Sequence, residues 1–225
     1  MSQNIDEEGV LIDNYLIAND GNFNESQFIE LLKSATYPPR NIRQNINDIK
    51  AQIAANNKGI AALHGLLHKY GQQTVSNYME HVRANAALEI RRLLSDLEDG
   101  QATSTMDDGS KIVVSIRINK KTRSAVIDFS GTSAQTKNNL NTPLAVTRAA
   151  VLYVFRTLTR ANIPLNDGCM EPLELIIPKG SLLNPCEPAA VVAGNVETSQ
   201  IIVDTLYRAL NIMAASQGSM NNFTF

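Results

Sequence analysis

Five clusters rich in Asn, Ser, Thr, Gln and Gly are the parts of this sequence best suited to chemistry. They lie in the second half of the chain, at residues 130–133, 138–141, 166–169, 194–200 and 216–222. Neutral amides and hydroxyls of this kind can hydrogen-bond a small polar substrate without adding net charge. The same residue types also dominate turns and helix caps. One such cluster alone favours a turn, whereas five clusters at the ends of predicted elements favour a binding site.

The stretch Gly194–Glu197 is the strongest of these clusters. We expect Asn195 to be the N-cap of the last long helix, with Thr198 and Ser199 in its first turn, so that free backbone N–H groups point at whatever precedes the helix. Such groups stabilise an anion or a developing oxyanion. The alternative is that Glu197 itself satisfies the helix dipole and the cluster is only a cap.

The histidines and cysteines give weaker signals. His64 and His68 are four residues apart, a spacing found in zinc sites, but Gly65 follows His64 where a metalloprotease motif has Glu, and the neighbouring leucines favour a packing role. His81 is expected at the surface. Cys169 could be a nucleophile only if a base approached it in space, and a buried thiol is the commoner case. We therefore assign no metal ligand.

Hydrophobic periodicity predicts the elements that position these residues. From Ile42 to Leu97 apolar residues recur at heptad spacing, interrupted at Gly71. This pattern predicts two antiparallel helices, at about 40–70 and 73–98, whose apolar stripes pack against each other. We expect the polar stretch 101–110 that follows to be a loop. It would separate a mainly helical region, 1–100, from a second region, 101–225.

The second region changes to alternating periodicity. Residues 111–118 and 124–130 predict a β-hairpin. Further elements are expected in the order helix 143–160, strand 173–177, strand 189–192 and helix 196–214. The fold class that we predict is therefore α+β, with a long antiparallel helical hairpin followed by a mixed α/β region that contains a β-hairpin.

Composition excludes several classes of function. The 225 residues carry 20 Lys and Arg against 22 Asp and Glu, and this formal charge of −2 does not suit binding to a phosphate backbone. No apolar run reaches the length of a membrane span, and the start MSQNIDEEGV has no signal-peptide pattern. Two cysteines do not make a disulfide framework. We expect a cytoplasmic protein that binds neither nucleic acid nor membranes.

Longer stretches of the sequence carry a family resemblance. They are NIRQNINDIKAQIAANNKGIAAL, DFSGTSAQTKNNLNTPLAVTRAAVLY, IPLNDGCMEPLELIIPKGSLLNP, AAVVAGNVETSQIIVD and ASQGSMNNFTF. In this order they resemble the hydantoinase B / 5-oxoprolinase family, and the resemblance extends from about Glu8 to Phe225. So many motifs in one order are far more specific than a single short motif.

The resemblance implies a function. Members of that family hydrolyse small cyclic amides, 5-oxoproline or hydantoins, in ATP-driven reactions with a hydantoinase A-like partner, which is fused or separate. It therefore implies part of such a hydrolase, working in an oligomer, with ATP and Mg²⁺ bound mainly outside this chain. The absence of a phosphate-loop motif here agrees with that.

Two alternatives stay open beside that reading. Related subunits occur in acetone carboxylases, so the chain could be part of such a subunit. It could also be a non-catalytic interaction domain, in which the hairpin 40–98 docks a partner and the polar clusters are turns only. The family pattern extends beyond this sequence at both ends, and its upstream part includes a candidate divalent-metal site. The resemblance thus implies a fragment of a larger chain, inactive alone, and transfers no metal ligand.

The resemblance also marks site residues, to which we give hypothetical roles. As catalytic residues we expect Asn195, which would hold a lactam or phosphorylated-lactam oxygen, and Glu197 or Asp167, which would orient water. The expected substrate-binding residues are Gly131, Thr132, Asn139, Asn141, Asn166, Gly194, Thr198, Ser199, Gln200, Gln217, Asn221 and Asn222.

Overall fold

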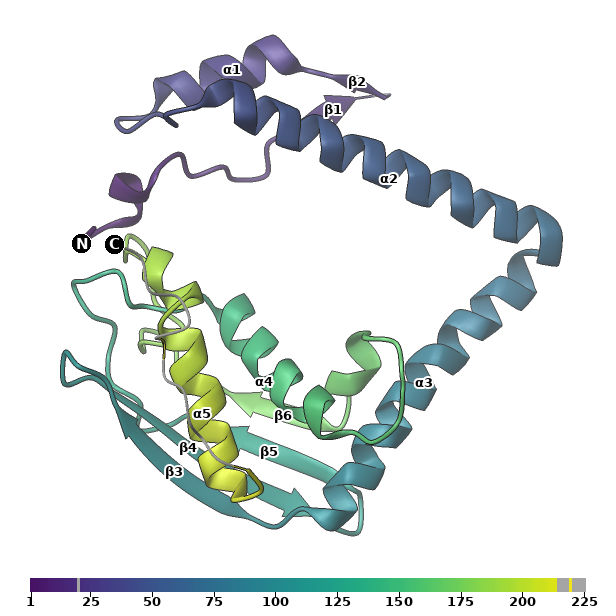
Figure 1. Ribbon diagram of the computed structural model, residues 1–225, viewed down its shortest axis with the longest axis vertical. Helices are drawn as coiled ribbons and strands as arrows, with labels where there is room; N and C mark the ends of the chain where they lie inside the picture. The colour runs from purple at the N-terminus through teal and green to yellow at the C-terminus, as the bar shows by residue number, and fades with distance from the viewer. Residues whose placement is uncertain (20, 214–218, 220–225) are drawn as a thin grey trace. The chain divides into compact units, whose positions relative to one another are not determined.

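The computed structural model describes residues 1–19, 21–213 and 219, and it confirms the predicted α+β class (Figure 1). The chain divides into two units: one comprises Ile5–Met79, and the other comprises Met1–Asn4 together with Glu80–Phe225. None of the described helices combines the length and the apolar character that crossing a membrane requires.

The unit Ile5–Met79 is built around two helices. It begins with the 3₁₀ helix η1 (Ile5–Glu8) and the short antiparallel strands β1 (Ala18–Asn19) and β2 (Asn22–Phe23), followed by the helices α1 (Glu25–Ser34) and α2 (Ile42–Tyr70). Phe28 and Leu32 are four residues apart, so they share one face of α1, and they are buried in the same small core as Ile46 of α2. The Asn41 side chain caps α2 by accepting a hydrogen bond from the Gln44 N–H.

The two long helices are confirmed, but their predicted seam is not buried. Helix α2 ends before Gly71, which has a φ of 79°, and α3 covers Gln72–Asp96. On α2, Ile60, Leu63 and Leu66 are 55%, 38% and 48% exposed, respectively. A physical reason lies in α3, whose later apolar residues Ala86, Ile90, Leu94 and Leu97 are buried in the core of the other unit. That face of α3 is therefore already occupied.

The second unit contains a four-stranded mixed sheet. Its strands are β3 (Gly100–Thr105), β4 (Lys111–Asn119), β5 (Ser124–Asp128) and β6 (Leu173–Ile176), in the order β3-β4-β5-β6. The first three are antiparallel, which confirms the predicted hairpin between β4 and β5. Strands β5 and β6 are parallel and are connected through α4 (Leu144–Leu158). The last described helix is α5 (Thr198–Leu210).

Two predicted elements are wrong. Residues 100–105, predicted as part of a loop, form β3, because the buried Ser104 hydroxyl accepts a hydrogen bond from Thr205 of α5 at 2.7 Å and the polar strand can therefore pack against that helix. The predicted strand 189–192 is not formed. Ala189 makes only an isolated bridge with Asn4, and the Ala190 carbonyl accepts a hydrogen bond from the Asn141 side chain instead of a neighbouring strand.

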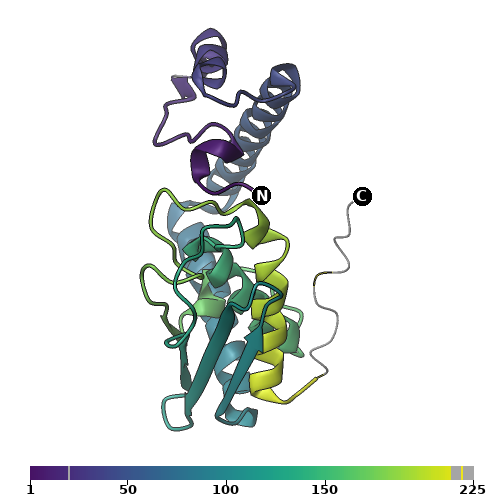
Figure 2. The same ribbon diagram turned by 90° about the vertical axis from the view of Figure 1, so that its left-hand side faces the viewer.

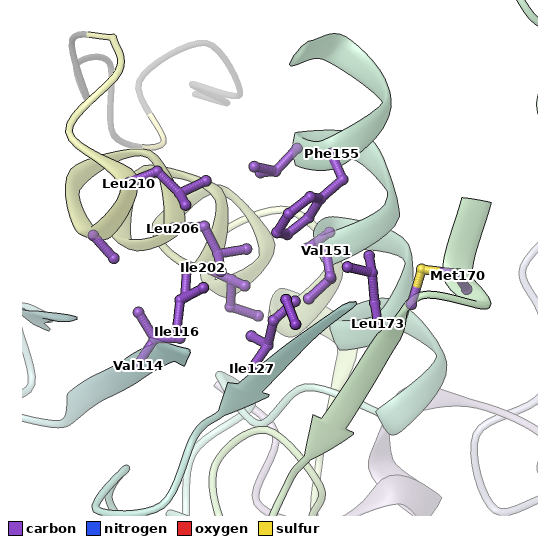
Figure 3. Close-up of a cluster of buried hydrophobic side chains, with 14 of the residues drawn as sticks. Val114, Ile116, Ile127, Val151, Phe155, Met170, Leu173, Ile202, Leu206 and Leu210 are labelled. Atoms are coloured by element: carbon purple, nitrogen blue, oxygen red, sulfur yellow. The ribbon is translucent and has the colours of Figure 1, made fainter. Parts of the chain in front are cut away.

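The core lies between one face of the sheet and the helices α4 and α5 (Figures 1 and 2). Alternate residues of β4 point into it, as the period of two requires. Figure 3 shows sheet residues Val114, Ile116 and Ile127 facing Val151 and Phe155 of α4 and Ile202 and Leu206 of α5. Burial of one such side chain contributes about 1.5–3 kcal/mol, so this packing fixes where both helices begin relative to the strands.

Candidate functional site

Most of the predicted polar clusters meet at one edge of the sheet, which we call the carboxyl edge because β5 and β6 end there. The loop after β5, residues 129–143, runs beside the loop after β6, since Leu182 N donates to Ser133 O and Thr142 N to Leu182 O. Helices α4 and α5 begin at the same edge. In open sheets with parallel strands, ligands bind outside the carboxyl ends of the strands.

Asn141 organises the loop after β5. Its side chain is completely buried and donates to the carbonyls of Thr136, Asn138 and Ala190 at 2.9–3.0 Å, while its Oδ1 accepts from Thr136 N at 2.8 Å. These bonds use both donors and one acceptor site of the amide. Asn141, predicted to bind substrate, therefore has a clear role in holding the loop.

Two threonines of the predicted set are also engaged in the fold. The Thr132 hydroxyl accepts from Val113 N at 3.1 Å and donates to Val113 O at 3.2 Å, which ties the turn at Gly131 to β4. Gly131 itself has a φ of 92°, a conformation that favours glycine. The buried Thr198 hydroxyl donates to Leu140 O at 2.6 Å and so connects the start of α5 to the loop after β5.

Gly194 lets two segments approach each other closely. It lies in the 3₁₀ helix η3 (Val192–Asn195), and a Cβ built on it would be 2.1 Å from the Asn141 carbonyl oxygen and 2.9 Å from the Thr142 Cα. Both neighbouring atoms belong to the backbone and cannot rotate away. A glycine is therefore required for η3 to pack against the loop after β5.

The predicted N-cap is wrong by two residues. Glu197, not Asn195, is the N-cap of α5, because η3 leads almost directly into the helix and Asn195 is still part of that 3₁₀ turn. The exposed Asn195 offers its carbonyl to the Ser199 hydroxyl at 2.6 Å. Gln200 is half-buried in the first turn of α5, where its backbone N–H donates to Glu197 O.

Glu197 does not use its side chain as a helix cap. The carboxylate makes no capping hydrogen bond, and its Oε2 instead accepts a hydrogen bond from the Ser219 hydroxyl. The negative charge still lies at the positive end of the α5 dipole, which stabilises it. This contact brings Ser219, the one described residue of the predicted cluster 216–222, to the cluster 194–200. Gln217, Asn221 and Asn222, also predicted to bind substrate, lie outside the described residues.

Asn139 differs from its neighbour Asn141. Its side-chain oxygen Oδ1 is buried and has no hydrogen-bond partner in the described structure. Its backbone carbonyl accepts from Ala193 N at 3.0 Å, and the Ala193 carbonyl accepts from Glu197 N at 2.8 Å. A buried acceptor without a partner is costly. The backbone of the residue that carries this one is linked to Glu197 through Ala193.

Asp108 and Asn138 were not among the predicted site residues, and the structure places them at the same edge. Asn138 Nδ2 donates to Asp108 Oδ2 at 2.8 Å, and Ser110 N donates to Asp108 Oδ1 at 2.8 Å. Partial desolvation opposes ionisation of the carboxyl, but the hydrogen bonds from Ser110 and Asn138 outweigh it and lower the pKa of Asp108. The Asp-Gly turn at 108–109 is the sequence signal that could have suggested this anchor.

The cluster 166–169 lies at the opposite edge of the sheet. Asp167 is in the 3₁₀ helix η2 (Asp167–Met170), directly before β6 begins, and Asn166 caps it by accepting from Gly168 N at 2.9 Å. A Cβ on Gly168 would be 2.1 Å from the Arg83 carbonyl oxygen of α3. The structure therefore does not bring Asp167 together with Glu197. Cys169 is a buried thiol, as expected.

Metal-binding groups do not gather in the part of the chain that the structure describes. There, no three His, Cys, Asp or Glu side chains lie close enough to hold an ion. His64 and His68 are exposed on α2, and His81 is exposed on α3. The groups around η3 are amides, hydroxyls and the Glu197 carboxylate, whose negative charge would repel a phosphate.

Comparison with known proteins gives consistent matches. The family model described as hydantoinase B/oxoprolinase matches residues 1–225. The chain is 41% identical over 233 residues to the 5-oxoprolinase of Dictyostelium discoideum, a match that covers 100% of this chain and 18% of that protein. This sequence thus spans less than a fifth of that relative's length.

Solved structures share the fold. The chain superimposes on the ATP-dependent caprolactamase of Pseudomonas jessenii with a TM-score of 0.76 at 21% identity, covering 90% of this chain and 36% of that one. It superimposes on a nucleotide-free acetone carboxylase, also with a TM-score of 0.76, at 14% identity, covering 98% of this chain and 30% of that one. At these identities the likeness establishes the architecture alone.

Proposed function

Because this chain belongs to the hydantoinase B/oxoprolinase family, we propose that it is part of an ATP-dependent hydrolase that opens a cyclic amide, 5-oxoproline or a hydantoin. The observation that supports this best is the convergence at the carboxyl edge. There the Glu197 carboxylate accepts from Ser219. Asn139, whose buried side-chain oxygen has no partner in the described structure, is linked to Glu197 by backbone hydrogen bonds through Ala193.

These groups match the needs of a lactam. A cyclic amide presents one N–H donor and one carbonyl acceptor, and the Asn139 Oδ1 is a buried acceptor that such an N–H would satisfy. Asn195, exposed at the end of η3, would hold the carbonyl oxygen. Recognition of the lactam group itself is neutral, which fits a site made mainly of amides and hydroxyls.

Glu197 would activate the water. Amide resonance makes the carbonyl carbon a poor electrophile, and ATP, when bound to the assembled enzyme, supplies the phosphoryl group that overcomes this. With the carbonyl oxygen phosphorylated and ADP released, water would add to the carbonyl carbon, and Glu197 would accept a proton from that water and pass it to the ring nitrogen as the C–N bond breaks. The acyl phosphate that remains would be hydrolysed by a second water to the carboxylate and inorganic phosphate. Asp167, at the other edge, would not share this role.

The nucleotide would be bound by another polypeptide or domain. The sequence has no phosphate-loop motif and the Glu197 carboxylate would repel a phosphate, so we infer that a hydantoinase A-like partner carries ATP and Mg²⁺ and that the working protein is an oligomer. The length of the relatives, of which this chain is a small part, agrees with a larger assembly.

The test is turnover by the full-length protein with its hydantoinase A-like partner. We expect ATP-dependent release of glutamate from 5-oxoproline, with hydantoin and acetone as comparison substrates, and no turnover by residues 1–225 alone. Glu197→Gln should lower kcat by about a hundredfold or more, and Asn139→Ala should lower kcat/KM by about threefold to tenfold. Thr122→Ala, in the β4–β5 turn at the opposite edge, is the control.

The outcomes separate the alternatives. Turnover of acetone in place of both cyclic amides would assign the chain to a carboxylase-type subunit. If Asn195→Ala and Glu197→Gln both leave turnover within about twofold, the catalytic roles proposed for them are wrong, since such groups ordinarily contribute far more.

An interaction domain is the second candidate function. It is favoured by the exposure of Ile60, Leu63 and Leu66 on α2, because contiguous exposed apolar surface marks binding sites. The variant that tests this second function is Leu63→Asp in the full-length protein. If the chain is only a docking module, this change abolishes association with the partner, measured by sedimentation, while Glu197→Gln leaves both association and turnover unchanged.

A further inference from the structure

We propose that Ser219 is a positioning residue that fixes the Glu197 carboxylate in its reactive orientation, an inference that rests on the proposed function because it takes Glu197 as the group that activates water. Ser219 lies in the predicted cluster 216–222 but was given no individual role from the sequence. Its hydroxyl donates a hydrogen bond to Glu197 Oε2 across 22 residues of sequence, and both side chains are half-buried.

The backbone of Glu197 is held firmly on both sides. Its N–H donates to Ala193 O at 2.8 Å, and its carbonyl accepts from Gln200 N at 3.1 Å and from Ile201 N at 3.3 Å. These bonds fix the Cα, because they join the 3₁₀ turn to the first turn of α5. They do not fix the carboxylate, which lies beyond three further rotatable bonds.

The Ser219 hydroxyl supplies what the helix does not. Glu197 makes no side-chain capping bond, so the first turn of α5 does not hold its carboxylate. A glutamate side chain left free would lose about 1.5–2 kcal/mol of rotamer entropy on being ordered at each turnover. A hydrogen bond to Oε2 orders it in advance and leaves the other oxygen, Oε1, to accept from a water molecule.

The chemistry of the donor suits this role. A serine hydroxyl donates one hydrogen bond, carries no charge and does not titrate near neutral pH. It therefore orients the carboxylate and leaves its charge in place, whereas a Lys or Arg side chain would neutralise that charge. A misplacement of about 1 Å in a catalytic group can cost about a hundredfold in rate, so loss of this single hydrogen bond can lower the turnover rate.

The experiment compares variants of the full-length protein in its complex with the hydantoinase A-like partner, with 5-oxoproline as substrate. Ser219→Ala should lower kcat by about tenfold to a hundredfold with KM within about twofold. Ser219→Thr, which keeps the hydroxyl, should restore most of kcat. In Glu197→Gln the further change Ser219→Ala should add little, because the two residues act as one unit.

A matched control separates positioning from folding. Ser95→Ala removes a hydroxyl that bonds only to its own helix, donating to Arg91 O of α3, and should leave kcat and KM unchanged. Thermal unfolding of Ser219→Ala should match that of the parent protein, which excludes a loss of activity through misfolding.

Each contrary result has its own meaning. Full activity of Ser219→Ala beside an inactive Glu197→Gln would overturn the role of Ser219 and leave the proposed function standing. Losses that multiply in the double variant, or no rescue by Thr, would show that Ser219 acts elsewhere and would equally overturn the inference. An active Glu197→Gln would remove its premise together with the proposed mechanism.

Discussion

Two asparagines in one loop illustrate how little residue type alone says about role. Asn141 donates to three carbonyls and is completely buried, whereas Asn139, two residues earlier, has a buried side-chain oxygen without a partner. The same amide thus makes several hydrogen bonds that stabilise the fold at one position, whereas at the other its oxygen makes none in the described structure. Sequence alone assigned both to substrate binding, because it contains no information on which carbonyls lie near them.

This difference predicts opposite outcomes for two substitutions. Asn141→Ala leaves the carbonyls of Thr136, Asn138 and Ala190 without that donor, so the free energy of unfolding should fall by about 2–4 kcal/mol. Asn139→Ala removes no side-chain hydrogen bond that the structure shows for Oδ1 and should change it by less than about 1 kcal/mol. Urea unfolding followed by circular dichroism measures both. Equal losses would contradict the separation of roles.

Asp128, at the end of β5, should make stability depend on pH. Hydrogen bonds from the Ser130 hydroxyl and backbone N–H, with a smaller effect of Arg117, lower the pKa of its carboxyl. A lowered folded-state pKa adds stability above the pKa of the unfolded chain, about 3.9, and this contribution is lost as pH falls through the folded value. Asp128→Asn should therefore flatten the acid side of the stability profile.

Urea midpoints between about pH 7 and pH 3 would measure this effect. The parent protein and Asp128→Asn should differ by a constant amount near neutral pH and converge below about pH 4. Glu30→Gln, which removes an exposed carboxylate on α1, controls for the loss of one charge. A difference that grows on acidification would have the opposite sign and would exclude this account.

At the scale of elements, the approach of η3 to the loop after β5 depends on one missing side chain. Gly194→Ala would place a methyl group 2.1 Å from the Asn141 carbonyl oxygen, so one of the two segments must move. We expect a loss of about 1–3 kcal/mol in the free energy of unfolding and a displaced start of α5. Gly65→Ala is the matched control, because nothing lies within 4 Å of its Cβ.

In α2 the same type of change should have the opposite sign. Gly65 lies in the middle of a 29-residue helix, where alanine is favoured over glycine by about 0.5–1 kcal/mol. Differential scanning calorimetry should show Gly194→Ala melting earlier than the parent protein and Gly65→Ala melting no earlier. Similar melting of Gly194→Ala and the parent would show that η3 can shift at little cost.

Which elements the sequence predicts follows from how local their causes are. Helices α2, α3 and α4 and the β4–β5 hairpin are confirmed, because periodicity and turn residues act within each segment. Strand β3 was missed, since its buried Ser104 accepts a hydrogen bond from Thr205, about a hundred residues away. The sequence also did not predict that the later apolar residues of α3 are buried in the core of the sheet.

The candidate site follows the same rule. Clusters 130–133, 138–141 and 194–200 converge at one edge of the sheet. The first two lie between the end of β5 and the start of α4, and the third lies at the start of α5. Asp167 has the residue type for the same chemistry, but it precedes β6 and therefore lies at the other edge. The contact of Ser219 with Glu197 was not predicted, because no local pattern links two residues 22 positions apart. In each case the position of the residue in the folded chain, not its type, determines whether it belongs to the candidate site.

For the whole molecule, the two units have cores of very different size. In Ile5–Met79 the buried apolar cluster consists of Phe28, Leu32 and Ile46, whereas the other unit buries faces of α3, α4, α5 and three strands together. Local stability follows buried apolar contact. We therefore expect backbone amides of Ile5–Met79 to exchange with solvent much faster than those of β4 and β5, as hydrogen exchange with mass spectrometry would measure.

Phe28→Ala tests whether the units are energetically separate. Phe28 is 2% exposed, with the rings of Tyr15 and Phe23 at 5.8 and 6.1 Å, so its loss should destabilise Ile5–Met79 by about 3–5 kcal/mol. Protection should disappear there and persist in β4, whereas Phe155→Ala should remove it from β4. Loss of protection in β4 with Phe28→Ala would mean one cooperative unit. Since Asn139, Glu197 and Ser219 all lie in the second unit, separate units would leave the carboxyl edge intact in Phe28→Ala.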